Sequence, residues 1–81
     1  MAELDIVAFL RSCLDEREEQ YSNAPEVYGW ELADVKAKRQ IIELCATETD
    51  ETGGRPLAIR TLRLLALPYA EHPDYQERWR P

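Results

Sequence analysis

The last third of this chain decides its fold, and it reads Thr61-Leu-Arg-Leu-Leu-Ala-Leu-Pro-Tyr-Ala-Glu-His-Pro-Asp-Tyr-Gln-Glu-Arg-Trp-Arg-Pro81. An apolar segment runs into an aromatic tail through two prolines. The apolar run extends back to Pro56, which suits a first helical position because its missing N–H is not needed there. Leu67 precedes a proline, which disfavours helical geometry. We therefore expect a helix over 56–67, and its narrow polar stripe predicts that it is the most buried of the fold.

The aromatic tail contains a second helical signal. Pro73 can begin one more turn, and Tyr75 and Trp79 lie four residues apart, so that both rings share one face of a helix. We expect a short helical turn over 73–79 that lays these rings over the rest of the molecule.

Two earlier stretches also have helical spacing. The apolar residues Ile6, Leu10, Cys13 and Leu14 predict a helix over about 4–21, and Leu32, Val35, Ile42 and Cys45 predict one over about 29–47. The polar, glycine-containing segment between the second and third helices predicts a mobile loop over 47–55. Because no stretch alternates with a period of two, the expected fold is all-α. It is a single domain of residues 1–81, a small three-helix bundle with a short C-terminal helical turn and an aromatic tail.

Composition narrows the class of protein. The chain has 81 residues, enough for one small core, and its 44% hydrophobic and 32% charged content is that of an ordinary globular domain. No stretch approaches the ~20 apolar residues that cross a bilayer, and no signal-peptide pattern begins the chain. We expect a cytoplasmic protein with no membrane contact. The net charge of −6 makes nucleic acid an unlikely partner, since such binders are usually basic.

The candidates for metal binding or nucleophilic catalysis are the two cysteines and the one histidine of the chain, Cys13, Cys45 and His72. A structural zinc site needs about four closely spaced ligands, and these residues are isolated in sequence. Cys13 lies on the apolar face of an acidic helix, which should raise its pKa and suppress nucleophilicity. We therefore expect no cofactor, no metal and no enzyme activity. A small metal-binding protein that uses these three residues stays as an alternative.

Large aromatic and arginine side chains are the best candidates for an interaction surface, because such residues dominate binding hot spots. They are Trp30, Tyr69, Tyr75, Arg78, Trp79 and Arg80, with Glu16 and Glu19 as a second, acidic candidate face. The rings of the tail either complete the chain's own core or dock onto a second copy or another protein. The sequence predicts a non-catalytic interaction or regulatory protein that binds a protein partner or forms a homodimer. An acidic mimic of nucleic acid, or a nucleic-acid-associated protein, is the alternative.

A family resemblance rests on three segments, which are Val7–Arg11, Leu32–Arg39 and Thr61–Pro81. Together they resemble a family of small uncharacterised actinobacterial and actinobacteriophage proteins that carries a domain-of-unknown-function label. The resemblance implies a small intracellular helical protein and supplies no activity. Many relatives carry cysteines and histidines between the second and third helices, in a pattern that suggests metal binding. Here Ala46–Arg55 contains neither residue type, so no metal site is carried over.

Overall fold

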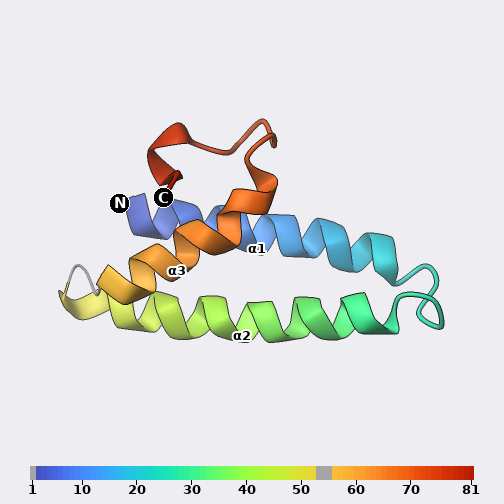
Figure 1. Cartoon of the computed structure of the whole chain (residues 1–81). Coiled ribbons are helices and arrows are strands. Elements are labelled where there is room, and N and C mark those ends of the chain that lie inside the picture. Colours follow the sequence, from blue (N-terminus) through green and yellow to red (C-terminus); the bar gives the residue numbers. More distant parts are fainter. Residues whose placement is uncertain (1, 53–55) are drawn as a thin grey trace.

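Three helices and two short helical turns make up the described chain. The computed structural model describes the backbone of residues 2–52 and 56–81, and the side chains of residues 5–47 and 56–81. The elements are α1 (Ala2–Tyr21), α2 (Gly29–Thr52), α3 (Pro56–Ala66) and two 3₁₀ turns, η1 (Leu67–Tyr69) and η2 (Glu77–Trp79) (Figure 1). The described residues contain no strand. The prediction of a small all-α three-helix bundle is confirmed.

The two long helices form an antiparallel hairpin (Figure 1). Ion pairs link them along one side: Arg39 donates to Asp15 and Glu18 at 2.7 Å each, and Arg11 donates to both oxygens of Glu43 at 2.8 Å. Exposed pairs contribute little stability each, about 0–1 kcal/mol. Their forked geometry instead favours one register of the two helices.

The core lies where the three helices meet. Leu10 of α1, Ile42 of α2 and Leu62 of α3 are at most 1% exposed. Burying an aliphatic side chain of this size contributes roughly 1.5–3 kcal/mol. The whole buried set is Ile6, Val7, Phe9, Leu10, Cys13, Leu14, Val35, Ile42, Cys45, Ala58, Leu62, Ala66 and Trp79.

Helix α2 continues past the predicted loop. A loop was expected from residue 47, but the helix runs to Thr52. The Thr47 hydroxyl donates to the Glu43 carbonyl at 2.9 Å, so this polar residue is accommodated inside the helix. Threonine, glutamate and aspartate lower helix propensity only modestly, whereas glycine ends helices, and the first glycine after Gly29 is Gly53. The rest of the predicted loop, 53–55, lies outside the described residues.

Helix α3 is less buried than its composition predicted. It buries Ala58, Leu62 and Ala66, which lie four residues apart on one face. Leu57 and Leu64 on the other side are 78% and 57% exposed. A short helix laid against one side of a hairpin can bury one face only, so the apolar residues of its other side lie at the surface.

The tail is helical over a shorter stretch than expected. Only Glu77–Trp79 forms a turn of 3₁₀ helix, in place of the predicted 73–79. Before it, the Asp74 and Tyr75 amides donate to the Nδ1 atom and the carbonyl of His72, at 3.1 and 3.0 Å. These bonds close a turn around Pro73, and Gln76 is then extended, with φ −109° and ψ 133°. A helix cannot pass through an extended residue.

Candidate functional site

The aromatic tail closes onto the first helix of its own chain. Trp79 is 2% exposed and its ring centroid lies 5.1 Å from that of Phe9 on α1. Tyr75 packs edge-on against both rings, at 6.0 Å from Phe9 and 5.6 Å from Trp79. His72 and Tyr69 complete the cluster, with ring centroids 5.3 and 6.4 Å from Phe9. The rings that made the tail an interaction candidate therefore surround Phe9.

The charged side chains of the tail form ion pairs with α1 and with one another. Arg78 donates to the Asp5 carboxylate on α1 at 3.1 Å. Arg80 donates to both oxygens of Glu77 at 3.0 Å, which lowers the pKa of Glu77, and its guanidinium lies 5.8 Å from the Tyr75 ring centroid. Of the two arginines beside Trp79, one therefore joins the tail to α1 and the other stiffens the tail itself.

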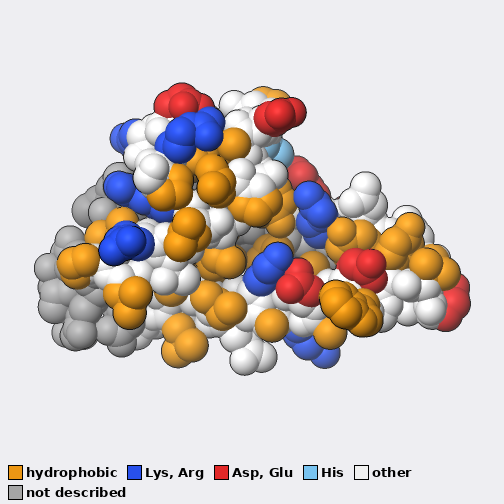
Figure 2. Space-filling model, viewed as in Figure 1, with side chains coloured by type: hydrophobic (Ala, Val, Ile, Leu, Met, Phe, Trp, Pro, Cys, Tyr) orange, Lys and Arg blue, Asp and Glu red, His pale blue; other side chains and the backbone are white. Residues whose placement is uncertain are grey.

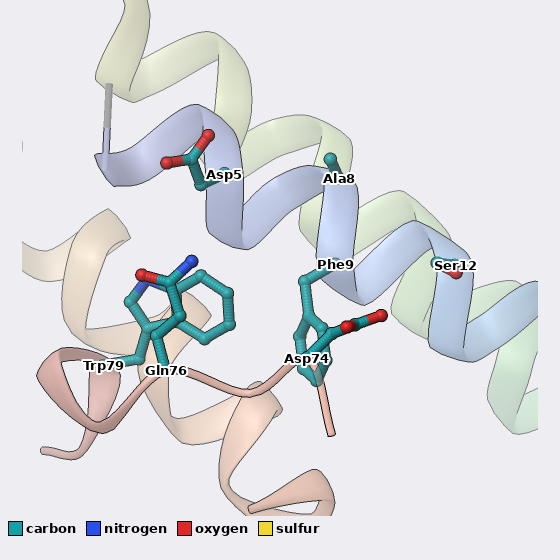
Figure 3. A pocket seen from close by; sticks show the side chains of 7 residues that line it. All are labelled: Asp5, Ala8, Phe9, Ser12, Asp74, Gln76 and Trp79. Atoms are coloured by element: carbon teal, nitrogen blue, oxygen red, sulfur yellow. The ribbon is translucent and has the colours of Figure 1, made fainter. Parts of the chain in front are cut away.

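A pocket of about 470 Å³ follows the seam between α1 and the tail (Figure 3). Phe9 and Trp79 project into the space between the two segments, and Asp5 and Asp74 contribute carboxylates from opposite sides of it. Asp5 is already bound to Arg78. The Trp79 indole nitrogen is buried and has no hydrogen-bond partner within the described part of the chain. The pocket thus marks where the tail joins the bundle.

The residues considered for metal or nucleophilic chemistry do not form a site. Burial, followed by the charge of Glu16, raises the pKa of the Cys13 thiol to about 11, the direction expected from the sequence. Cys45 is also buried, and His72 is engaged with Phe9 and the Asp74 amide. Across residues 5–47 and 56–81, no group of three or more His, Cys, Asp or Glu side chains is placed to hold a metal ion. The set Cys13, Cys45 and His72 is accordingly not brought together.

The remaining predicted residues lie apart from the tail cluster or at its edge. Trp30 is 82% exposed at the start of α2. Tyr69 is half-buried with the Arg17 guanidinium 5.2 Å from its ring centroid, and burial raises its pKa. The Glu16 carboxylate lies 3.7 Å from the Nε2 atom of His72, and Glu19 is exposed on α1. Of the aromatic candidates, only Trp30 presents most of its ring to solvent.

Sequence reasoning missed a second apolar surface, which the structure places on the outer sides of two helices. The α2–α3 face, as we call it, consists of Trp30, Ala33, Ala37, Ile41 and Leu44 on α2 with Leu57 and Leu64 on α3. All seven side chains are exposed. Hydrophobic side chains gather over α3 and along α2 in this view (Figure 2). The available signal was the recurrence of α2 residues at steps of three and four on the side opposite the core stripe.

Helix α2 carries three basic residues, Lys36, Lys38 and Arg39, and the last two are engaged in ion pairs. Arg39 binds Asp15 and Glu18, and Lys38 lies 2.9 Å from the Asp34 carboxylate one turn earlier. Lys38 and Arg39 therefore pair with nearby acids of α1 and α2. None of the helices, over the residues described, is long and apolar enough to cross a membrane.

Comparison with known families places most of the chain in a single one. A family described as a family of unknown function, DUF6221, matches residues 25–81. The matched region contains α2, α3 and the whole tail, including both tryptophans. No match was found among curated proteins or among solved structures.

Proposed function

This chain belongs to the DUF6221 family of unknown function, and from that premise we propose that it is a non-catalytic interaction protein that docks through the α2–α3 face. The observation that carries the proposal is the contrast between the two tryptophans. Trp79 is 2% exposed in the chain's own core, whereas Trp30 is 82% exposed at one end of an apolar face. Contiguous exposed apolar surface on a small protein is a frequent mark of an interaction site.

The chemistry of the other candidates supports a non-catalytic role. The Cys13 thiol is buried with a pKa raised to about 11, which disfavours the thiolate that a nucleophile needs. Charged groups of the long helices, such as those of Arg11 and Arg39, are engaged in ion pairs at the surface. From the resemblance of the three sequence segments, we also propose an actinobacterial or actinobacteriophage source and a cytoplasmic location.

Affinity capture from a lysate of the source organism, with the purified chain as bait, tests this proposal. We expect the wild-type chain to retain a partner that the Leu64→Glu variant loses, because the substitution places a charge on the α3 part of the apolar face. Glu19→Arg is the matched control, since it changes a charge on the opposite, acidic helix. Equal retention by the wild type and Leu64→Glu would contradict the proposal.

The salt dependence of partner binding distinguishes this proposal from the alternative that the chain is an acidic mimic of nucleic acid. Docking through apolar surface should survive an increase in salt, whereas a mimic that acts through Glu16 and Glu19 should release its basic partner steeply as salt rises. A partner lost with rising salt but retained by Leu64→Glu would favour the mimic.

A further inference from the structure

We propose that the last part of the tail, residues 73–81, is a strap that lifts from α1 as one unit while the three helices stay folded, and that its release uncovers the surface around Phe9. The inference goes beyond the proposed function, because it concerns α1 and the tail and not the α2–α3 face. The attachment of the strap, the polar atoms that it buries and the independence of the helical core each support it.

The strap is attached to the helices by side chains alone. Its backbone N–H groups donate to groups within the tail, and no backbone group of the strap is hydrogen-bonded to a helix within the described part of the chain. Only Trp79 of the strap is buried, against Phe9 of α1. The other charged link to α1 is the ion pair of Arg78 with Asp5, and both of its side chains are about half-exposed. The strap can therefore leave without breaking a backbone hydrogen bond of any helix.

Two buried polar atoms weaken this attachment. The hydroxyl oxygen of Tyr75 and the indole nitrogen of Trp79 are enclosed by the chain itself, and neither has a hydrogen-bond partner among the described residues. A polar group that leaves water without gaining a partner destabilises the state that buries it. Because both atoms regain water when the strap lifts, this cost falls on the closed state alone and favours release.

The three helices have a core that does not depend on the strap. Leu10, Ile42 and Leu62 come from α1, α2 and α3 and are at most 1% exposed. The strap adds only Trp79 to the buried set. Segments with few buried contacts open at a lower free energy than the core of the same protein. We therefore expect the strap to open more often than the whole molecule unfolds.

Release changes the surface of α1. The pocket along the seam is bounded on α1 by Asp5, Ala8, Phe9 and Ser12, and the strap forms its other wall (Figure 3). In the closed state Phe9 is 7% exposed, with the rings of Tyr75 and Trp79 against it. Lifting the strap removes both of these rings from Phe9. The strap is thus an intramolecular cover that controls whether this aromatic surface is available for contact.

Native-state hydrogen exchange, followed by NMR at increasing urea, tests the proposal. We expect the indole N–H of Trp79 to exchange at least about tenfold faster than the slowest amides of α1 and α2. Its rate should depend only weakly on urea, because lifting the strap exposes little surface, whereas the core amides should show the steep slope of global unfolding. The backbone N–H of Trp79 should report the same opening constant as the indole, because the strap leaves as one unit.

Tyr75→Phe removes one of the two unpaired polar atoms and keeps the ring. We expect this variant to slow exchange of the Trp79 indole by about tenfold, because the closed strap no longer buries an unpaired hydroxyl. Tyr28→Phe is the matched control. It removes the same hydroxyl from an exposed tyrosine in the turn before α2 and should leave the exchange rate unchanged.

Indole exchange that matches the slowest core amides in both rate and urea slope would overturn the proposal, since the strap would then open only when the whole fold does. A Tyr75→Phe variant that exchanges as fast as the wild type, or faster, would overturn it as well. The Leu64→Glu variant, which tests docking through the α2–α3 face, should leave these rates unchanged, so the two proposals fail separately.

Discussion

Replacing Trp79 by alanine should remove a large part of the stability of this protein. The indole is 2% exposed and packs 5.1 Å from the Phe9 ring centroid and 5.6 Å from that of Tyr75. Truncation of a buried tryptophan to alanine costs about 3–5 kcal/mol. The high end applies if the tail detaches, because the contact between Tyr75 and Phe9, worth about 0.5–1.5 kcal/mol beyond burial, is then lost as well.

The size of the chain makes this loss easy to measure. At 81 residues, a total unfolding free energy of about 4–12 kcal/mol is expected. A loss of 1 kcal/mol lowers the Tm of a domain this small by about 4–8 °C. Trp79→Ala should therefore lower the Tm by more than 12 °C or so, and urea unfolding followed by circular dichroism should show a midpoint well below that of the wild type.

The chain provides its own control for this substitution. Trp30→Ala removes the same side chain from a position that is 82% exposed, so it should change the unfolding free energy by no more than about 0.5 kcal/mol at dilute concentration. Equal effects of the two substitutions, or a loss below about 1 kcal/mol for Trp79→Ala, would refute the assignment of Trp79 to the core.

Three further predictions concern deletion of the tail, titration of the Cys13 thiol and the ion pairs of Arg39. Deleting 73–81 should lower the Tm at least as much as Trp79→Ala and should increase binding of a hydrophobic dye, because Phe9 becomes exposed. Burial raises the pKa of the Cys13 thiol from 9.0 to about 11. The unfolded state therefore loses this proton first as pH rises, and the free energy of unfolding should fall by about 2–3 kcal/mol between pH 9 and 11. Cys13→Ala should remove that part of the pH dependence in urea titrations. Arg39→Ala should cost about 1 kcal/mol or less by losing Asp15 and Glu18, and the difference from wild type should shrink at about 1 M salt; an undiminished difference would show that the loss is not electrostatic.

The helical class was predictable because the core stripes of the first two helices have clear periodicity. Leu10, Val35 and Ile42, expected inside, are all buried. The end of α2 was harder to place, because Thr47 and the polar residues after it resemble a loop in composition while remaining compatible with a helix. The polar composition thus predicted a loop that begins too early. The position of the first glycine after the helix start, Gly53, was the better guide to where α2 ends.

The burial of α3 was not predictable from its composition. Leu57, Leu62 and Leu64 are the same residue type, yet Leu62 is fully buried while the other two are 57–78% exposed. An apolar helix has no polar face to mark its solvent side, so only the placement of its neighbours decides which leucines are covered. The exposed pair then became visible as part of an interaction face.

The sequence did not decide whether the aromatic rings of the tail complete the chain's own core or dock onto another molecule. The deciding residue was Phe9, the chain's one phenylalanine, which packs against four rings of the tail region. Phe9 lies beside the main stripe of α1, so the helical spacing of the apolar residues did not single it out. Contacts between residues so distant in sequence are not encoded in any local pattern.

The most direct test of the account is whether Trp79 contacts Phe9 within a single chain. Nuclear Overhauser effects between the two rings, measured on a mixture of isotope-labelled and unlabelled chains, distinguish contacts inside one molecule from contacts between two. The account predicts strong effects within the labelled chain, in keeping with the 5.1 Å ring separation, and none between chains. Effects that appear only between labelled and unlabelled chains, or no effect at all, would contradict it.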